Sequence, residues 1–175
     1  MSDSTQPIVR AAGLTNALDA VAGLQIPALL FEPKKPNGKA VLYLHGNSMK
    51  EDAAPGGPIE ALVKQGHLVL AAELRGIGET ETGLRKKAFG AGRFGRDNLE
   101  TLTAYLMGMS YVGMRADDVR RWTGYLKTKA SDVQIIAIGE AAIPALHAAV
   151  LDREAFSSIT LRRMMLAPWL TGTPN

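Results

Sequence analysis

Short apolar runs alternate with amphipathic stretches along this chain. The apolar runs are continuous and stop at glycine, proline or charged residues, which is typical of strands buried on both faces of a sheet. The predicted strands are residues 24–31, 40–44, 67–74, 133–138 and 158–166. Apolar positions at helical spacing predict helices over 58–65, 98–127 and 140–151. This order predicts an α/β domain with a mostly parallel sheet, right-handed crossovers and helices on both faces.

Four residues set finer expectations within these elements. Pro27 lies inside the first strand and favours an edge or a bulge, because proline donates no ladder hydrogen bond. Asp97 is the predicted N-cap of the long helix, which we expect to be broken near Gly113. Pro144 is tolerable because it falls in the first turn of its helix.

Length and composition limit the class of protein. The 175 residues fit one domain, predicted over 19–175 after a lead-in of residues 1–18, and 46% hydrophobic residues supply a core. The absence of cysteine excludes disulfides and thiolate chemistry. No run approaches the roughly 18 apolar residues of a membrane helix, and the polar start has no signal core. We expect a soluble, cytoplasmic protein, and a net charge of +3 gives no reason to expect nucleic-acid binding.

The sequence His45-Gly46-Asn47-Ser48 comes directly after a buried strand. The carboxyl end of a parallel strand is where α/β proteins place ligands. A glycine there lets the backbone approach a substrate, and in hydrolases such a loop offers a backbone N–H to a developing oxyanion. The alternative interpretation is a tight strand-to-helix turn with a buried histidine.

Two glycine-rich stretches fail as nucleotide-binding motifs. After the strand 67–74, Arg75-Gly76-Ile77-Gly78 lacks a third glycine, since Glu81 stands in its place. The sequence GAGRFG at 90–95 matches G-x-G-x-x-G, but no strand precedes it. With its basic neighbours this loop is interpreted either as a solvated surface loop or as an anion site at the start of the next helix. We expect no cofactor and no metal; of the pair Asp117-Asp118, one carboxylate is expected in a cap or salt bridge and the other in solvent.

The turn after the strand 133–138 decides the chemistry. In hydrolases this strand-to-helix turn carries a nucleophile elbow, G-x-S-x-G, which lifts a serine hydroxyl above the sheet. Here the sequence is Gly139-Glu140-Ala141-Ala142-Ile143. Ala141 therefore occupies the nucleophile position without a hydroxyl.

Four segments together resemble α/β-hydrolases, in particular the branch of acetyl xylan esterase-like and dienelactone hydrolase-like proteins. They are VLYLHGN (41–47), GGPIEALVKQGHLVLAAELRGIGET (56–80), AYLMGMSYVGMRADDVRRWTGYL (104–126) and VQIIAIGEAAIPALHAAV (133–150). The third is the most specific to the esterase branch. The resemblance implies a Ser-His-Asp carboxylic ester hydrolase acting on a small ester.

The chain departs from that pattern at the elbow and after 158–166, beyond which the family carries its acid and histidine. We expect an incomplete domain at the C-terminal end and weak or absent ester hydrolysis, so that whether the chain is an enzyme stays open. Gly46, Asn47 and the N–H of Ala142 would form a residual oxyanion site, with Arg75 in the binding loop. His45, His67 and His147 are interpreted as structural.

Two alternatives remain open. In the first, Ser48 is a displaced nucleophile with His45 as its base. In the second, the chain is a non-catalytic binding or assembly module. An unpaired sheet edge at 158–166 and apolar residues at 164–169 would then lead to a homo-oligomer, or to a partner chain at the C-terminal edge.

Overall fold

A computed structural model describes residues 18–21, 24–81 and 97–164 of the chain. The glycine-rich loop at 90–95 and the apolar tail beyond residue 164 lie outside the described residues. A five-stranded sheet has the order β3-β5-β4-β6-β7. These strands are β3 (Ala28–Phe31), β4 (Lys39–His45), β5 (Leu68–Ala72), β6 (Asp132–Ile138) and β7 (Ser158–Arg162). All neighbours are parallel except β3 and β5, which confirms the predicted mostly parallel sheet.

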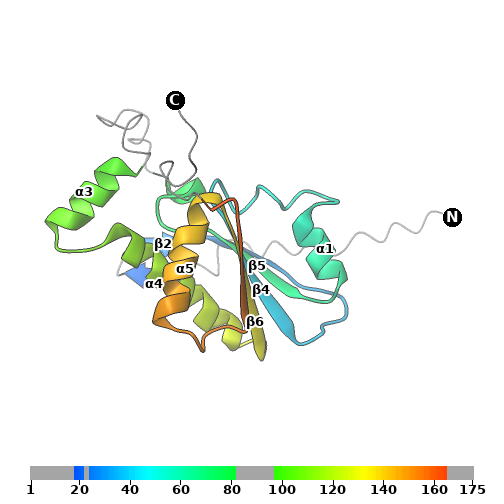
Figure 1. Cartoon of the computed structure of the whole chain (residues 1–175). Coiled ribbons are helices and arrows are strands. Elements are labelled where there is room, and N and C mark those ends of the chain that lie inside the picture. The colour runs from blue at the N-terminus through cyan, green and yellow to red at the C-terminus, as the bar shows by residue number, and fades with distance from the viewer. Residues whose placement is uncertain (1–17, 22–23, 82–96, 165–175) are drawn as a thin grey trace, which may run out of the picture.

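Helices cover both faces of this sheet (Figure 1). One face packs against α1 (Pro58–Lys64), and the other against α4 (Tyr111–Lys127) and α5 (Ala142–Leu151). The larger core lies on the α4 and α5 side and includes Trp122, which is completely buried. The three-layer α/β/α class is therefore as predicted, because alternating apolar runs must be buried from both sides.

The first predicted strand is divided at Pro27. Residues before it form β2 (Leu24–Ile26), which pairs with β1 (Leu18–Val21) in a separate two-stranded sheet, and those after it form β3. Pro27 has no N–H to donate, but its carbonyl accepts a hydrogen bond from the backbone N–H of Glu73 at 3.1 Å. The proline thus marks a change of sheet rather than a bulge within one strand.

The predicted long helix is two helices, α3 (Asn98–Leu106) and α4. The break lies at residues 107–110, where Gly108 has φ +73°, and not near Gly113. Gly113 is in the first turn of α4 and donates its N–H to the Oγ of the N-cap Ser110. Asp97 does occupy the N-cap of α3, but its carboxylate makes no cap hydrogen bond and pairs with Arg115 instead.

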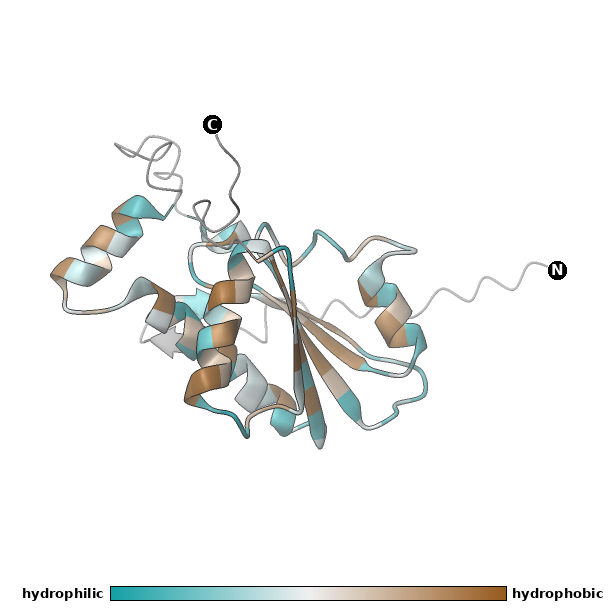
Figure 2. Cartoon of the chain, in the orientation of Figure 1, coloured by the Kyte–Doolittle hydropathy of each residue, from teal (hydrophilic) through white to brown (hydrophobic). Residues whose placement is uncertain are grey.

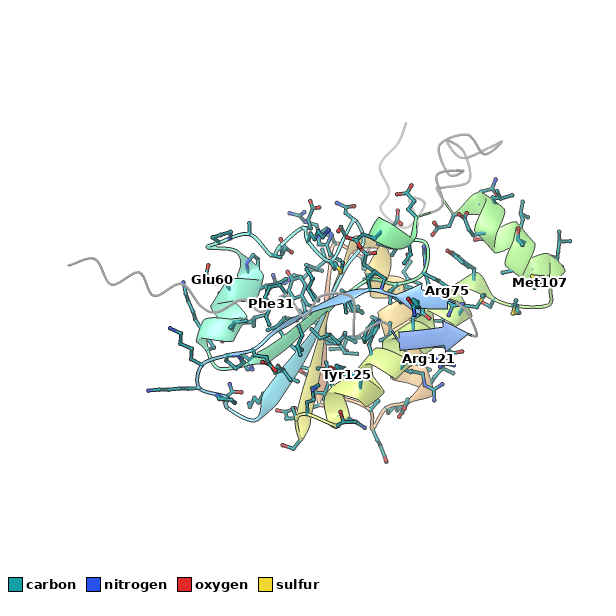
Figure 3. The ribbon with its side chains drawn as sticks, turned by 180° about the vertical axis from the view of Figure 1, so that it is seen from behind. Phe31, Glu60, Arg75, Met107, Arg121 and Tyr125 are labelled. Carbon is teal, nitrogen blue, oxygen red and sulfur yellow. The ribbon has the colours of Figure 1, made fainter. Side chains whose placement is uncertain are left out.

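Exposed apolar side chains gather on α3 and on α5. Most of α3 and the turn after it projects from the body, and Met107 at its end lies away from the sheet (Figure 3). Along α5, Ile143, Leu146, Val150 and Leu151 are at least 37% exposed. No helix in the described part of the chain is long and apolar enough to cross a membrane.

Candidate functional site

Three loops meet at the carboxyl edge of the sheet, after β4, β5 and β6. The loop after β4 contacts the turn after β6, because the N–H of Gly46 donates to the carbonyl of Ile138 at 2.9 Å. The approach is close enough that a Cβ at Gly46 would lie 2.6 Å from the backbone nitrogen of Glu140. Gly46 is therefore required by the packing of two loops against each other.

The sharp bend after β6 lies at Gly139 and not at Ala141. Gly139 has φ +65°, the left-handed conformation that a sharp turn needs, whereas Ala141 has φ −73° and ψ −16°. Ala141 lies in the short 3-10 turn η3 (Gly139–Ala141) and is completely buried in the larger core. This corrects the sequence assignment by two residues: the side chain that would project at the bend belongs to position 139, where a Cβ would meet only the Cα of Gly46 at 4.0 Å.

The three backbone donors assigned to an oxyanion site already have acceptors within the chain. The N–H of Gly46 is bonded to the carbonyl of Ile138. The N–H of Asn47 donates to the Nδ1 of His45 at 3.1 Å, and that of Ala142 donates to the carbonyl of Gly139. A developing oxyanion needs free donors aimed at it, so these three N–H groups do not form the predicted residual oxyanion site. With the bend at Gly139, the N–H that follows the nucleophile position is that of Glu140 and not that of Ala142.

Ser48 is oriented toward a carboxylate and not toward His45. Its Oγ lies 3.4 Å from the Oε1 of Glu73 and accepts a hydrogen bond from the N–H of Lys50. His45 is half-buried and its Nδ1 is the acceptor for Asn47. Within residues 18–21, 24–81 and 97–164, no serine hydroxyl is hydrogen-bonded to a histidine ring. The proposed Ser48–His45 pair is therefore not formed.

Glu73 is a central residue of this edge, and the sequence pattern assigned it no role beyond a place at the end of the predicted strand 67–74. It comes directly after the apolar residues of β5, and its side chain is buried with 1% exposure. Its Oε2 accepts the backbone N–H of Glu79 at 2.6 Å, so it ties the start of η1 (Gly78–Thr80) to the end of the strand. The signal was available in the sequence, because a charged residue directly after an apolar strand has to find partners in the loops around it.

The buried carboxyl group of Glu73 is expected to make the free energy of unfolding depend on pH. Burial raises the pKa of Glu73 above its ordinary value, and hydrogen bonds from backbone N–H groups, that of Glu79 first, offset this only in part. A raised pKa means that the folded state favours the protonated form of Glu73 more than the unfolded state does. The stabilisation that follows is complete below the ordinary glutamate pKa and is lost as pH rises through the pKa of Glu73 in the folded state. The parent is therefore expected to lose stability relative to Glu73→Gln over this range, measured by urea denaturation at a series of pH values. A stability difference that stays constant with pH would contradict this.

Arg75 makes a buried ion pair and does not line an open binding loop. Its Nε and Nη2 contact the two carboxylate oxygens of Asp118 on α4 at 2.8 and 2.5 Å. Its own carbonyl accepts hydrogen bonds from the Nε of Arg115 and the hydroxyl of Tyr111. Asp117, by contrast, has a half-exposed side chain paired with Arg120 on the same helix. The expected division is confirmed in burial, with Asp118 in a buried salt bridge and Asp117 exposed, but Asp117 is also ion-paired.

The remaining histidines lie outside this edge or on its surface. His67 precedes β5 at the opposite end of the strand, 3.5 Å from the amide nitrogen of Asn37. His147 is exposed on α5, with its Nδ1 2.9 Å from the carbonyl of Ile143. Among the described residues, no three His, Asp or Glu side chains are arranged to hold a metal ion.

Solved structures that superpose on this chain include α/β-hydrolases. A protein of Bacteroides fragilis assigned to the acetyl xylan esterases superposes with a TM-score of 0.63 at 17% identity, with 80% of this chain covering 41% of that protein. Dienelactone hydrolase from Anabaena variabilis superposes with a TM-score of 0.58 at 21% identity, with 85% of this chain covering 62% of that protein. A third structure is 2-hydroxy-6-oxo-6-phenylhexa-2,4-dienoate hydrolase from Rhodococcus sp. strain RHA1. It superposes with a TM-score of 0.52 at 22% identity, with 83% of this chain covering 44% of that protein.

These likenesses define the class of fold. The chain has the α/β-hydrolase fold, and it spans about two fifths to three fifths of the length of these three structures. No protein-family model and no curated protein sequence matches it. Because identities near 20% show the fold alone, activity has to be argued from the site.

Proposed function

We propose that this chain is an α/β-hydrolase-fold relative of carboxylic ester hydrolases whose own hydrolytic activity is absent or weak, that is, a pseudoenzyme. The observation that carries the proposal is the bend after β6, where Gly139 stands with φ +65° and supplies no side chain that could attack an ester. Enzymes that lose triad members retain roughly 10³–10⁴-fold catalysis from the oxyanion hole and binding. In the loop after β4, the N–H groups of Gly46 and Asn47 are bonded within the chain, which reduces even this remainder.

The side chains at the bend support the same conclusion. Gly139 brings no nucleophile to the position above the sheet, and the hydroxyl of Ser48 is directed to a buried carboxylate that is itself held by backbone N–H groups. If a small acyl ester is the ligand, this edge would bind it without turning it over. A cytoplasmic location is part of the proposal, and a chain without cysteine is compatible with a reducing compartment.

Hydrolysis of p-nitrophenyl acetate with and without a serine-reactive phosphonate tests this function. We expect a rate near that of buffer and no effect of the phosphonate, because no serine of the described segments is hydrogen-bonded to a histidine that could activate it. Brisk hydrolysis that the phosphonate abolishes would refute the proposal. Loss of that activity in Ser48→Ala would then identify the displaced nucleophile.

Serine substitutions at the bend separate the two positions. Gly139→Ser places a hydroxyl in open space at a cost of about 1–2 kcal/mol for the left-handed φ. Ala141→Ser buries a hydroxyl in the apolar core, at about 1–3 kcal/mol. Neither is expected to raise ester hydrolysis above the parent, because none of the three histidine rings is hydrogen-bonded to residues 139–141 in the described part of the chain. A gain of about 100-fold in either variant, a typical contribution of one positioned base, would contradict this.

A second candidate function is that of a non-catalytic assembly module. It is favoured by the β7 edge, where pairing within the described residues is with β6 alone, and by the exposed apolar side chains of α5. A homo-oligomer or a partner chain at this edge would then be the functional form.

A further inference from the structure

The β7 strand is an edge with an open side. Within the described residues it pairs in parallel with β6, and its other side has no partner strand. Exposed and half-buried side chains alternate along it, with Ser158, Thr160 and Arg162 exposed. The half-buried Ile159 and Leu161 pack against the larger core on the α5 side. An open edge of this kind is a template for pairing with another chain.

The sequence of β7 is self-complementary in an antiparallel register centred on Thr160. In that register Thr160 faces Thr160 of a second copy, and Ser158 faces Arg162. Ile159 then faces Leu161 on the other side of the sheet, which continues the apolar layer across the junction. The one charged side chain of the strand meets a serine and not its own copy, so no like charges oppose each other.

An exposed apolar stripe lies on α5, the helix next to this edge. Figure 1 shows α5 beside β7, which is drawn in orange-red, and the two elements are in contact. Figure 2 shows that much of α5 is hydrophobic. The stripe consists of Ile143, Leu146 and Val150, whose spacing places them on one helix face, and Val150 is 64% exposed. A two-fold axis through β7, perpendicular to the sheet, would place the two copies of α5 on the same face of the joined sheet, on either side of the junction.

We propose that a second copy of this chain occupies this surface, forming a two-fold dimer by antiparallel β7–β7 pairing with the α5 stripes packed beside it. A five-residue strand by itself falls short of the roughly 800 Å² per partner of a standard interface, so the helix stripe is needed to complete the contact. This dimer is one specific form of the assembly role, and it rests on that second candidate function. It is independent of whether the chain hydrolyses esters.

Cysteine cross-linking tests the register directly, because the chain has no cysteine of its own. Directly opposed residues of an antiparallel pair have Cα atoms about 4.5–5.5 Å apart, within the range of a disulfide. Thr160→Cys is expected to give a disulfide-linked dimer under mild oxidation on a non-reducing gel. The control Ser131→Cys is exposed directly before β6, away from the register centre at Thr160, and is expected to stay monomeric on that gel. A dimeric protein in which Thr160→Cys does not cross-link would overturn the proposed interface.

A charge exchange gives a second, non-covalent test. Thr160→Lys and Thr160→Asp each place like charges opposite each other at the axis, and each is expected to weaken dimerisation by at least about tenfold. An equimolar mixture of the two is expected to restore a dimer, as measured by light scattering, and a mixture that stays monomeric would contradict the register. Thr160 is exposed, so circular dichroism is expected to show both variants folded.

The simplest test of the dimer uses the parent protein without any substitution. Light scattering at about 100 μM is expected to give the mass of two chains, since interfaces of standard size dissociate in the micromolar range or below. A monomer at that concentration overturns the dimer and leaves the proposed loss of ester hydrolysis unaffected. Conversely, phosphonate-sensitive esterase activity in a dimer would refute the pseudoenzyme and leave the interface standing.

Discussion

Asp118→Ala is expected to lower the free energy of unfolding by about 3–5 kcal/mol, because it leaves Arg75 as an unpaired buried charge. The side chain of Asp118 is fully buried and that of Arg75 is 7% exposed, so water does not replace the lost carboxylate. Asp118 also accepts the backbone N–H of Arg75 at 3.2 Å, which the variant leaves unsatisfied. Urea denaturation with an unchanged m-value measures the loss.

The adjacent carboxylate provides a matched control for this prediction. Asp117→Ala removes the same charge one residue earlier on α4, where the side chain is 56% exposed, and is expected to change stability by about 0.5 kcal/mol or less. The double variant Arg75→Ala with Asp118→Ala should cost less than the sum of the two single changes, because the second substitution removes the stranded charge. If Asp117→Ala and Asp118→Ala lower the free energy of unfolding equally, the ion pair between Arg75 and Asp118 does not hold the loop after β5 to α4.

Gly78→Ala is expected to cost about 2–5 kcal/mol, from two causes that add. The residue has φ +61°, which costs an L-residue about 1–2 kcal/mol. Its Cβ would also overlap the buried carboxylate of Glu73, and overpacking of this kind costs about 1–3 kcal/mol. The same carboxylate holds η1, so the variant is expected to loosen the whole loop after β5.

Gly38→Ala isolates the backbone part of that cost. Gly38 has φ +80°, and a Cβ there would have nothing within 4 Å. It is expected to lose about 1–2 kcal/mol in thermal or urea unfolding, from the left-handed φ alone. If Gly38→Ala and Gly78→Ala destabilise equally, the close packing of Glu73 against the loop contributes nothing and its place in the site has to be revised.

The sequence predicted those parts of the site that depend on residues close together in the chain. The loop after β4 and the turn after β6 do meet, as the carboxyl ends of parallel neighbours must. The assignment of the bend to Ala141 failed because matching G-x-S-x-G by its glycine ignores where the chain needs a left-handed φ, which is Gly139. The break between α3 and α4 was predicted but placed near Gly113 instead of at residues 107–110, because Gly108, where φ is positive, stands within an otherwise helical pattern.

Hydrophobic periodicity by itself determined the α/β class, the order of the elements and their burial from both sides, because solvent exclusion acts on every residue of a run in the same way. The tertiary structure alone decided the partners of the polar groups at the carboxyl edge. Gly46 meets Ile138, Ser48 meets Glu73 and Arg75 meets Asp118 across distant parts of the chain. Such pairings depend on angles and distances of a few ångströms between separate loops, and no pattern of residue types encodes these.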